Sequence, residues 1–440
     1  MIAKFRKERI TVREMGLIIL AGVMIAITGV GAPTQDNLRE SASRIHQEIW
    51  SRMVDSGTGV LFDYADIDGK VEIPTPEECS DGKPNALGWW TPIENGAFFN
   101  GLYMEALCSK WQQESLPETK AEIQKISSGL LLLQQVGIRP GFIARGFSTD
   151  GVTHHPIGSD DQTFPWFYGL WKYLESGIAD EAERAAIIAR MDFVARAVKE
   201  LDWRMPCEVP YTIRGNWVAE NFNLAVRLIF VNRIMLELTG DEFWRQSLDE
   251  VLNYKFADGR TRIDIIAAGD VEMQKHHTWT HSMSVAGLKE MLRIETDPVR
   301  QLQYRQGLQK TGGIAAPFIG EYRNFRTDVD AGFSGDWRIM NAIWRPQPTV
   351  NDAVKLAEEQ VKMINAASPQ SQQEKRYVRW PLFAAWIVLM SEDDQLIAKE
   401  LPAIRSALMH YQWDKLRHSD FFVGENIFYA MPETKGSGSN

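Results

Sequence analysis

The densest group of reactive side chains lies in the segment from Gly141 to Tyr168. The candidate residues in it are two histidines, two adjacent aspartates, an amide and an arginine, namely His154, His155, Asp160, Asp161, Gln162 and Arg145. A carboxylate and an imidazole that lie close together can move protons to and from a substrate. Because one of the two adjacent aspartates is expected to cap the helix that follows, the other remains available for proton transfer with a histidine.

Glu94 is a second candidate acid, and it stands between aromatic residues just before an expected helix. Two interpretations stay open. The carboxylate can simply be favoured by the positive end of the helix dipole, or it can act as a catalytic acid or accept a hydrogen bond from a sugar hydroxyl. Trp90 and Trp166 are candidate substrate-binding residues, because flat aromatic faces stack on the C–H surfaces of sugars. Asn95, beside Glu94, is a further candidate for substrate binding.

Further candidates for substrate binding lie in three later segments. They are Tyr211, Arg214, Glu220 and Asn221, then His276, His277 and His281, and finally Arg323 and Trp337. The arginines suit a carboxylate or sulfate on a sugar, because a guanidinium can make two parallel hydrogen bonds to such a group. The histidines would need an acidic partner to hold a metal, and the glutamate of an HExxH motif is missing, so we expect no metal and no other cofactor.

Helices must position these residues, because apolar residues recur at spacings of three and four through most of the sequence. About twelve helices are expected, near residues 36–55, 96–115, 118–136, 162–176, 180–201, 217–239, 242–254, 278–293, 297–310, 350–366, 380–391 and 394–412. Short turns alternate with long polar connections, which cover roughly residues 56–95, 137–161, 202–216, 255–277 and 311–349. Short turns produce antiparallel helical hairpins, so the long connections gather on one side. We therefore predict an all-α fold, with residues 33–433 forming a single (α/α)6 toroid.

The net charge and the N-terminal segment indicate which partners and which cellular compartment to expect. A formal net charge of −10 and the absence of a long basic stripe disfavour nucleic acid as a partner. The tryptophans in and beside the long connections favour a carbohydrate as the partner. Residues 1–32 combine basic residues with an apolar run, which is typical of a signal peptide or of an uncleaved N-terminal membrane anchor. We therefore expect an extracytoplasmic protein, periplasmic or secreted, that would meet a membrane only through this segment. The tail 434–440 is expected to be disordered.

The three cysteines, Cys79, Cys108 and Cys207, are too few for a disulfide scaffold and lack the spacing of a zinc site. One bridge between Cys79 and Cys108 is compatible with an oxidising compartment, and buried free thiols are equally compatible with the sequence.

Two stretches, WWTPIENGAFFNGLYMEAL and GFIARGFSTDGVTHHPIGSDDQTFPWFYGLWKY, resemble the six-hairpin glycosidase superfamily, whose members include unsaturated uronyl hydrolases. The resemblance covers most of the chain as architecture. It implies a glycoside hydrolase that acts on an oligo- or polysaccharide containing uronic acid. In such an enzyme two carboxylates act across the scissile bond, and Glu94 with Asp161 is our preferred pair. Asp160 and Glu220 are the alternatives.

Two other functions stay open. Related helical toroids include polysaccharide lyases, in which Arg145 or Asn221 would neutralise the carboxylate of a uronate. The base that removes the C5 proton would then be His154, His155 or Tyr211. A non-catalytic sugar-binding protein would use the aromatic residues alone.

Overall fold

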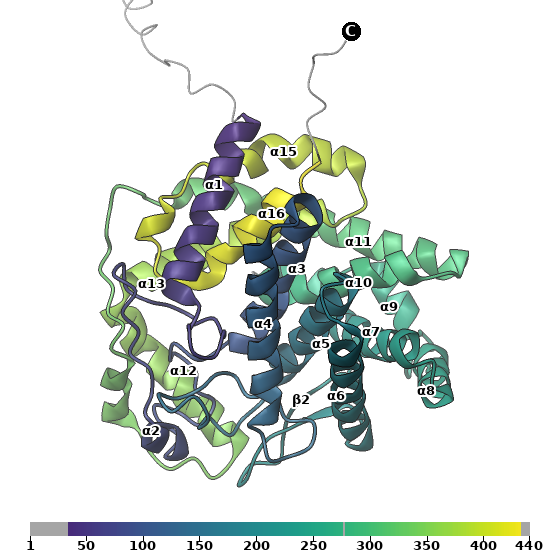
Figure 1. Cartoon of the computed structure of the whole chain (residues 1–440), viewed down its shortest axis with the longest axis horizontal. Coiled ribbons are helices and arrows are strands. Elements are labelled where there is room, and N and C mark those ends of the chain that lie inside the picture. Colours follow the sequence, from purple (N-terminus) through teal and green to yellow (C-terminus); the bar gives the residue numbers. More distant parts are fainter. Residues whose placement is uncertain (1–33, 276–277, 433–440) are drawn as a thin grey trace, which may run out of the picture.

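The computed structural model describes residues 34–275 and 278–432 (Figure 1). This part of the chain contains sixteen α-helices, several short 3-10 and π-helical turns, and one two-stranded antiparallel sheet. The prediction of an all-α fold is therefore confirmed, and all twelve predicted helices are present with somewhat shifted ends. The predicted N-terminal signal or anchor and the predicted disordered tail lie outside the described residues.

Six helices form a closed series of contacts, and we call them the inner helices. They are α3 (Gly96–Glu114), α5 (Asp160–Glu175), α7 (Phe222–Thr239), α10 (Thr278–Ile294), α14 (Trp380–Leu389) and α16 (Val423–Ala430). Each one packs against the next in this order, and α16 packs against α3. In α14 every residue from Pro381 to Leu389 is buried. A helix that is apolar on all sides is stable only when protein surrounds it, which explains its interior position.

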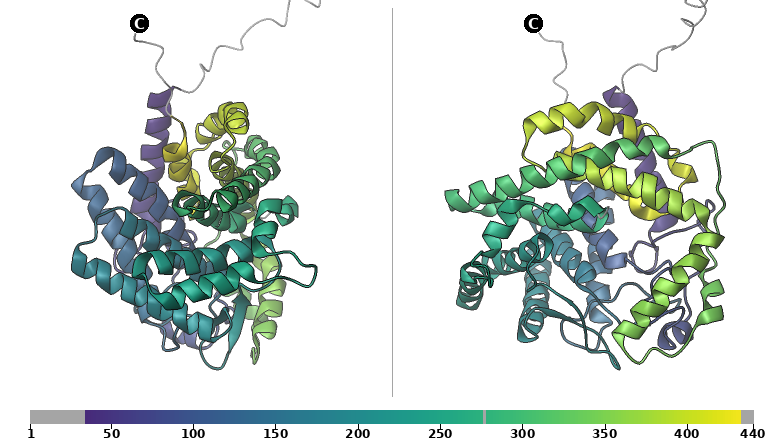
Figure 2. Two further views of the ribbon diagram at one scale, coloured as in Figure 1. Left: turned by 90° about the vertical axis from the view of Figure 1, so that its right-hand side faces the viewer. Right: turned by 180° about the vertical axis from the view of Figure 1, so that it is seen from behind.

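Six further helices, the outer helices, pack against the inner ones. They are α1 (Gln35–Glu48), α4 (Pro117–Gln135), α6 (Glu181–Glu200), α8 (Glu242–Asn253), α11 (Pro298–Ile319) and α15 (Asp394–Leu408). The helix α1 packs against α16, α4 packs against α3 and α5, and both α6 and α8 pack against α7. The helix α11 packs against α10 and α14, and α15 packs against α14. In α8 the buried residues Trp244, Ser247, Leu248 and Val251 follow the helical period, as expected for a helix with one buried face. Because α1 lies beside α15 and α16, the two ends of the described chain meet (Figures 1 and 2).

The predicted short turns are confirmed, and particular residues end one helix and begin the next. Ser115, with a φ of 52°, follows the last residue of α3, and Pro117 begins α4. Asp180, Asp241 and Asp297 accept backbone hydrogen bonds at the starts of α6, α8 and α11. Such caps satisfy N–H groups that have no partner inside the helix.

A long connection precedes each inner helix. In the described chain these connections span residues 54–95, 136–159, 201–221, 254–275, 320–379 and 409–422. They contain α2 (Pro76–Ser80), β1 (Arg204–Pro206), β2 (Ile213–Asn216), α9 (Arg262–Ala268), α12 (Val350–Ala367), α13 (Pro369–Glu374) and a π-helical turn at Lys375–Arg379. The two strands pair antiparallel, with Arg204 opposite Asn216 and Pro206 opposite Ile213.

The helix α12 is not the hairpin member that its apolar pattern suggested. It packs on the connections instead: Gln360 Nε2 donates to Pro84 O at 2.7 Å, and Trp90 Nε1 donates to Ala357 O at 2.8 Å. The sixth inner helix is α16, which was not predicted because its eight residues are too few to display a helical period. The helix α11 continues to Ile319, beyond its predicted end near residue 310.

The described chain settles two smaller points. Cys79, Cys108 and Cys207 are buried free thiols, so no bridge joins Cys79 to Cys108. Among residues 34–275 and 278–432, no helix has both the length and the apolar character needed to cross a bilayer.

Candidate active site

Contacts join the first two turns of the inner helices to one another in a closed circuit. In order they are Gln162 Nε2 to Asn95 Oδ1 at 3.1 Å, Arg227 Nη1 to Asp160 Oδ2 at 2.5 Å, Arg227 Nη2 to Thr280 O at 3.2 Å, Thr278 Oγ1 to Trp380 O at 3.1 Å, and ring contacts of Phe422 with Phe383 and Phe99. The starts of the inner helices therefore lie at one end of the molecule. The ends of the long connections meet there, and so do the positive ends of the helix dipoles.

Ten charged residues gather at this end, five acidic and five basic. We call them the central cluster: Asp63, Glu94, Asp160, Asp161, Asp420, Arg145, Arg214, Arg227, Lys375 and Arg379. They come from α7 and from the segments that lead into or begin α3, α5, α7, α14 and α16. The cluster is thus assembled by the fold from residues far apart in the sequence.

Glu94 lies two residues before α3, as predicted, and is partly exposed. Its Oε2 accepts a hydrogen bond of 2.7 Å from Trp90 N. Trp90 has a φ of 73°, a left-handed conformation that costs a residue with a side chain on the order of 1–2 kcal/mol. The other end of Trp90 is fixed as well, because its indole Nε1 donates to Ala357 O of α12. Backbone strain that is held in place by its surroundings is concentrated at functional sites.

Asp63 is the buried neighbour of Glu94. Its oxygens accept hydrogen bonds from Asn95 N at 2.7 Å and from Asn95 Nδ2 at 2.6 Å. Burial and the negative charge of Glu94 raise the pKa of Asp63 well above its ordinary value, despite these hydrogen bonds. Asp63 therefore keeps its proton at pH values at which an exposed aspartate is ionised.

The buried guanidinium of Arg145 links the Glu94 segment to the start of α5. Its Nη1 donates to Glu94 O at 3.0 Å, and its Nη2 donates to Ser159 Oγ at 2.7 Å and lies 3.7 Å from Asp161 Oδ1. Ser159 Oγ in turn donates to Asp161 Oδ1. Burial alone would raise the pKa of Asp161, but Arg145 and Arg214 outweigh it and lower this pKa below its ordinary value. Asp161 is therefore ionised, and its side chain is 26% exposed.

Asp160 points to the other side, toward α7 and β2. Its Oδ2 accepts the hydrogen bond from Arg227, yet burial outweighs this arginine and raises the pKa of Asp160. Gly215 of β2 has a φ of 85°, and a Cβ on it would lie 2.5 Å from Asp160 Oδ1. Only glycine allows this approach, which also brings the adjacent Arg214 to the cluster.

The prediction that Asp160 or Asp161 caps α5 is wrong. The N-cap position belongs to Ser159, and the two aspartates are the first two residues of the helix. Both carboxylates therefore face the central cluster from the first turn, where the helix dipole favours negative charge.

Lys375 and Arg379 enter the cluster from the π-helical turn before α14. Arg379 Nε lies 2.7 Å from Asp420 Oδ1, and its guanidinium lies 4.3 Å from the centre of the Trp279 ring. Lys375 Nζ lies 5.2 Å from the centre of the Trp90 ring. Burial and the positive charge of Arg379 lower the pKa of Lys375. Single π-helical turns occur frequently at functional sites.

His418 adjoins the cluster as a neutral group. Both of its ring nitrogens are buried and have no hydrogen-bond partner within the described chain. Burial, together with Lys375 and Arg379, lowers the pKa of His418 well below its ordinary value. His418 therefore adds no positive charge.

Partly exposed aromatic rings accompany the charged residues. Trp89 and Trp90 meet edge to face with their ring centres 5.9 Å apart, and Trp279 packs against Phe98 at 5.2 Å. Such surfaces suit the apolar faces of sugar rings.

The structure brings eight of the predicted site residues to this end of the molecule. They are Trp90, Glu94, Asn95, Arg145, Asp160, Asp161, Gln162 and Arg214.

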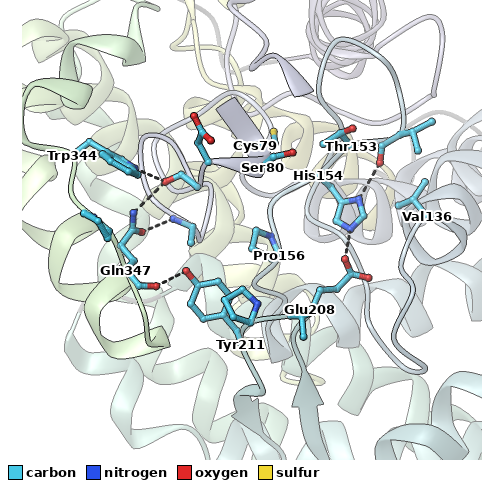
Figure 3. Close-up of a pocket in the computed structure, with 17 residues that line it drawn as sticks. Cys79, Ser80, Val136, Thr153, His154, Pro156, Glu208, Tyr211, Trp344 and Gln347 are labelled. Carbon is cyan, nitrogen blue, oxygen red and sulfur yellow. Dashed lines mark hydrogen bonds and ion pairs between the residues drawn. The ribbon is translucent and has the colours of Figure 1, made fainter. Parts of the chain in front are cut away.

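His154 and Tyr211 lie elsewhere, in the wall of a cavity of about 610 Å³ that we call the outer pocket (Figure 3). His154 stands between a backbone carbonyl and Glu208, with Nε2 at 3.1 Å from Glu208 Oε2. Tyr211 donates its hydroxyl to a backbone carbonyl at 2.7 Å. In the described part of the chain, no hydrogen bond, ion pair or ring contact joins either residue to Glu94 or Asp161. The candidate catalytic carboxylates Glu94, Asp160 and Asp161 belong to the central cluster, so we place the candidate active site there.

His155 is completely enclosed. Its Nε2 lies 2.9 Å from Lys83 O, and its Nδ1 lies 3.8 Å from the sulfur of Cys79. Burial lowers the pKa of His155 to about 4, so the ring is neutral.

The other predicted binding residues are spread over the molecule. Trp166 and Trp337 are completely buried in the core. Asn221 caps α7 by accepting a backbone hydrogen bond. Glu220 is exposed and pairs with a surface arginine, and Arg323 is exposed beside a tyrosine ring.

His281 belongs to a small group between α7 and α10. Its Nδ1 lies 2.5 Å from Asp270 Oδ2, and Asn223 Nδ2 lies 3.1 Å from both partners. His276 and His277 lie outside the described residues. Among the described residues, no group of three or more histidine, cysteine or acidic side chains is arranged to hold a metal ion.

Six residues of the site were not predicted. They are Asp63, Arg227, Lys375, Arg379, His418 and Asp420. Arg227 lies within α7, and the other five stand in long connections that lead into α3, α14 or α16. Polar residues at the end of a connection, just before an apolar helix, are the signal that would have found most of them. Comparison of the chain with protein-family models, curated proteins and solved structures found no match.

Proposed function

We propose that this protein is a glycoside hydrolase built as an (α/α)6 toroid, and that it cleaves an oligo- or polysaccharide containing acidic sugars. The closed series of inner helices, each packed against an outer helix, supports the toroid. One observation carries the function. Two partly exposed carboxylates, Glu94 and Asp161, stand at the starts of neighbouring inner helices, and the guanidinium of Arg145 lies between the two segments, donating to the backbone carbonyl of Glu94 and lying 3.7 Å from the carboxylate of Asp161.

In the proposed reaction Glu94 donates a proton to the leaving oxygen, and Asp161 acts as the base or nucleophile on the other side of the sugar. Asp161 suits its role because Arg145 and Arg214 keep it ionised. Glu94 is the partly exposed carboxyl in this part of the site, and Asp63 retains a proton beside it.

The sugar would be held by the partly exposed rings of Trp89, Trp90 and Trp279. Trp90 ties this surface to the acid, since its backbone N–H donates to Glu94 while its indole is anchored to α12. A strained and doubly anchored residue keeps its geometry when the substrate arrives, which lowers the entropy cost of binding.

A polysaccharide lyase has less support. Arg145 is buried and already donates to protein oxygens with Nε, Nη1 and Nη2, and the side-chain oxygen of Asn221 caps α7, so the protein already fixes both side chains. Of the proposed bases, His155 is enclosed, and His154 and Tyr211 line the outer pocket. A purely sugar-binding protein would not need an ionised and a proton-holding carboxyl group in one site.

The reaction type can be tested with acidic oligosaccharides, both saturated and 4,5-unsaturated, in water labelled with heavy oxygen. We expect new reducing ends that carry the label, because water completes a hydrolysis, and we expect unsaturated chains to lose their double-bond absorbance as the released sugar rearranges. A rise in that absorbance from saturated chains would establish a lyase. Binding without any cleavage of either kind would contradict both enzymes.

A further inference from the structure

Three of the five cations in the central cluster have carboxylate partners. The pairs are Arg227 with Asp160, Arg379 with Asp420, and Arg145 with Asp161. Arg214 and Lys375 have no ion-pair partner among residues 34–275 and 278–432, although both are partly buried. Enclosed charges are costly unless they are paired, so these two stand out.

Each unpaired cation lies over one ring of the adjacent tryptophans. The Arg214 guanidinium lies 5.2 Å from the centre of the Trp89 ring, and Lys375 Nζ lies 5.2 Å from the centre of the Trp90 ring. A ring face attracts a cation but leaves its hydrogen-bond donors free. Trp90 has a left-handed backbone conformation, and its ring lies edge to face with the ring of Trp89. Each of the two rings therefore has its own cation.

The two cations act on different carboxylates of the proposed reaction centre. Arg214 acts electrostatically on Asp160 and Asp161, whereas Lys375 interacts with Glu94 and with the acids around it. Burial lowers the pKa of both Arg214 and Lys375. The proposed acid and the proposed base thus each have one unpaired cation beside them.

We propose that Arg214 and Lys375 bind the acidic groups of two consecutive sugars, one on each side of the bond that is cleaved. The substrate class is then a chain in which adjacent sugars both carry a carboxylate or a sulfate. This inference rests on the proposed function for the position of the bond. A chain that alternates acidic and neutral sugars fills only one of the two positions.

Equilibrium binding tests this directly, and we would measure it by calorimetry with the catalytically impaired Glu94→Gln chain. The probes are a tetrasaccharide of consecutive uronates, a tetrasaccharide that alternates uronate with a neutral sugar, and a sulfated neutral tetrasaccharide. We expect the consecutive acidic chains to bind at least about tenfold more tightly than the alternating chain, because a charge-assisted contact contributes about that factor. Whichever consecutive chain binds more tightly identifies the group as carboxylate or sulfate.

Substitutions in the same background locate the effect. Lys375→Met and Arg214→Gln should each weaken binding of the preferred chain about tenfold, and the double variant about a hundredfold. The matched controls are Lys83→Met, whose Nζ lies 5.7 Å from the Trp344 ring, and Arg376→Gln, which lies 5.2 Å from the Tyr377 ring. Both controls lie outside the central cluster and should bind as the parent does.

Two results would overturn the inference: equal affinity for consecutive and alternating chains, or a double variant that binds as tightly as the parent. The outcome is separate from the test of the hydrolase. If binding depends on the charges but the unsubstituted protein cleaves nothing, only the proposed hydrolysis is wrong. If the protein cleaves chains but binds consecutive and alternating acidic chains equally well, only this inference is wrong.

Discussion

Asp63 and Asp161 carry the same type of side chain, but their pKa values are shifted in opposite directions. Asp63 is buried beside another carboxylate, and its pKa rises, whereas Asp161 is held by Ser159 and two arginines, and its pKa falls. The sequence identified Asp161 as a candidate because of its reactive neighbours along the chain. It could not identify Asp63, because the neighbours that change its pKa arrive through tertiary contacts.

His46 of α1 shows a similar effect away from the site. Its Nε2 lies 2.9 Å from Glu122 Oε1, and its Nδ1 lies 3.1 Å from Glu425 Oε2. Burial alone would lower the pKa of His46, but the two glutamates outweigh it and raise the pKa from 6.5 to about 9. Because the pKa of the folded state exceeds that of the unfolded chain, the stabilisation is complete below pH 6.5 and is lost as the pH rises through about 9.

Replacement of His46 by glutamine should remove this pH-dependent stabilisation, which amounts to on the order of 3 kcal/mol. Urea unfolding of both proteins at several pH values between 6.5 and 9 measures it as the difference between their free energies of unfolding. That difference should shrink steadily toward the alkaline end. Parallel curves for the two proteins would show that His46 gains no charge on folding.

At the scale of elements, the strand β2 delivers Arg214 to the cluster through the close approach of Gly215 to Asp160. Gly215→Ala should destabilise the protein by about 1 kcal/mol or more and lower its activity, because the new methyl group meets the Asp160 carboxylate. Gly259→Ala is a matched control: Gly259 has a φ of 87°, against 85° for Gly215, but its Cβ would meet nothing within 4 Å.

Thermal unfolding should show a loss of stability in both glycine variants, since both force a side chain into a left-handed conformation. Turnover of an acidic oligosaccharide should fall only in Gly215→Ala. If the two variants kept the same activity, β2 would have no part in positioning the site.

The helices and turns that could be predicted are those that are determined by residues close together in the sequence. Apolar periodicity found all twelve of the longer helices, and polar turn residues found the short connections. The role of α12 could not be predicted, because its amphipathic pattern says that one face is buried but not against what. The short α16 and the π-helical turn before α14 have no periodic signal of sufficient length.

At the scale of the molecule, the alternation of short and long connections indicated that the long ones share one side. The contacts around the starts of the inner helices agree with that expectation. Glu94 and Asp161 were predicted as partners from two separate connections, and Arg145 joins their segments by donating to the backbone carbonyl of Glu94 and lying 3.7 Å from Asp161 Oδ1. The histidines of the second connection, by contrast, lie in the outer pocket or in the interior, since a dense run of reactive residues along the chain need not face one way.

The central claim is that Glu94 and Asp161 together cleave the sugar chain. The most direct test is the kcat of Glu94→Gln and Asp161→Asn on the acidic oligosaccharide that the unsubstituted protein hydrolyses. Asp202→Asn serves as the control, because the Asp202 side chain is 83% exposed and lies outside the central cluster. We expect each site variant to retain its fold and to lose about a hundredfold to ten-thousandfold in kcat, while the control keeps full activity. A folded variant of either carboxylate with kcat near that of the unsubstituted protein would contradict the account.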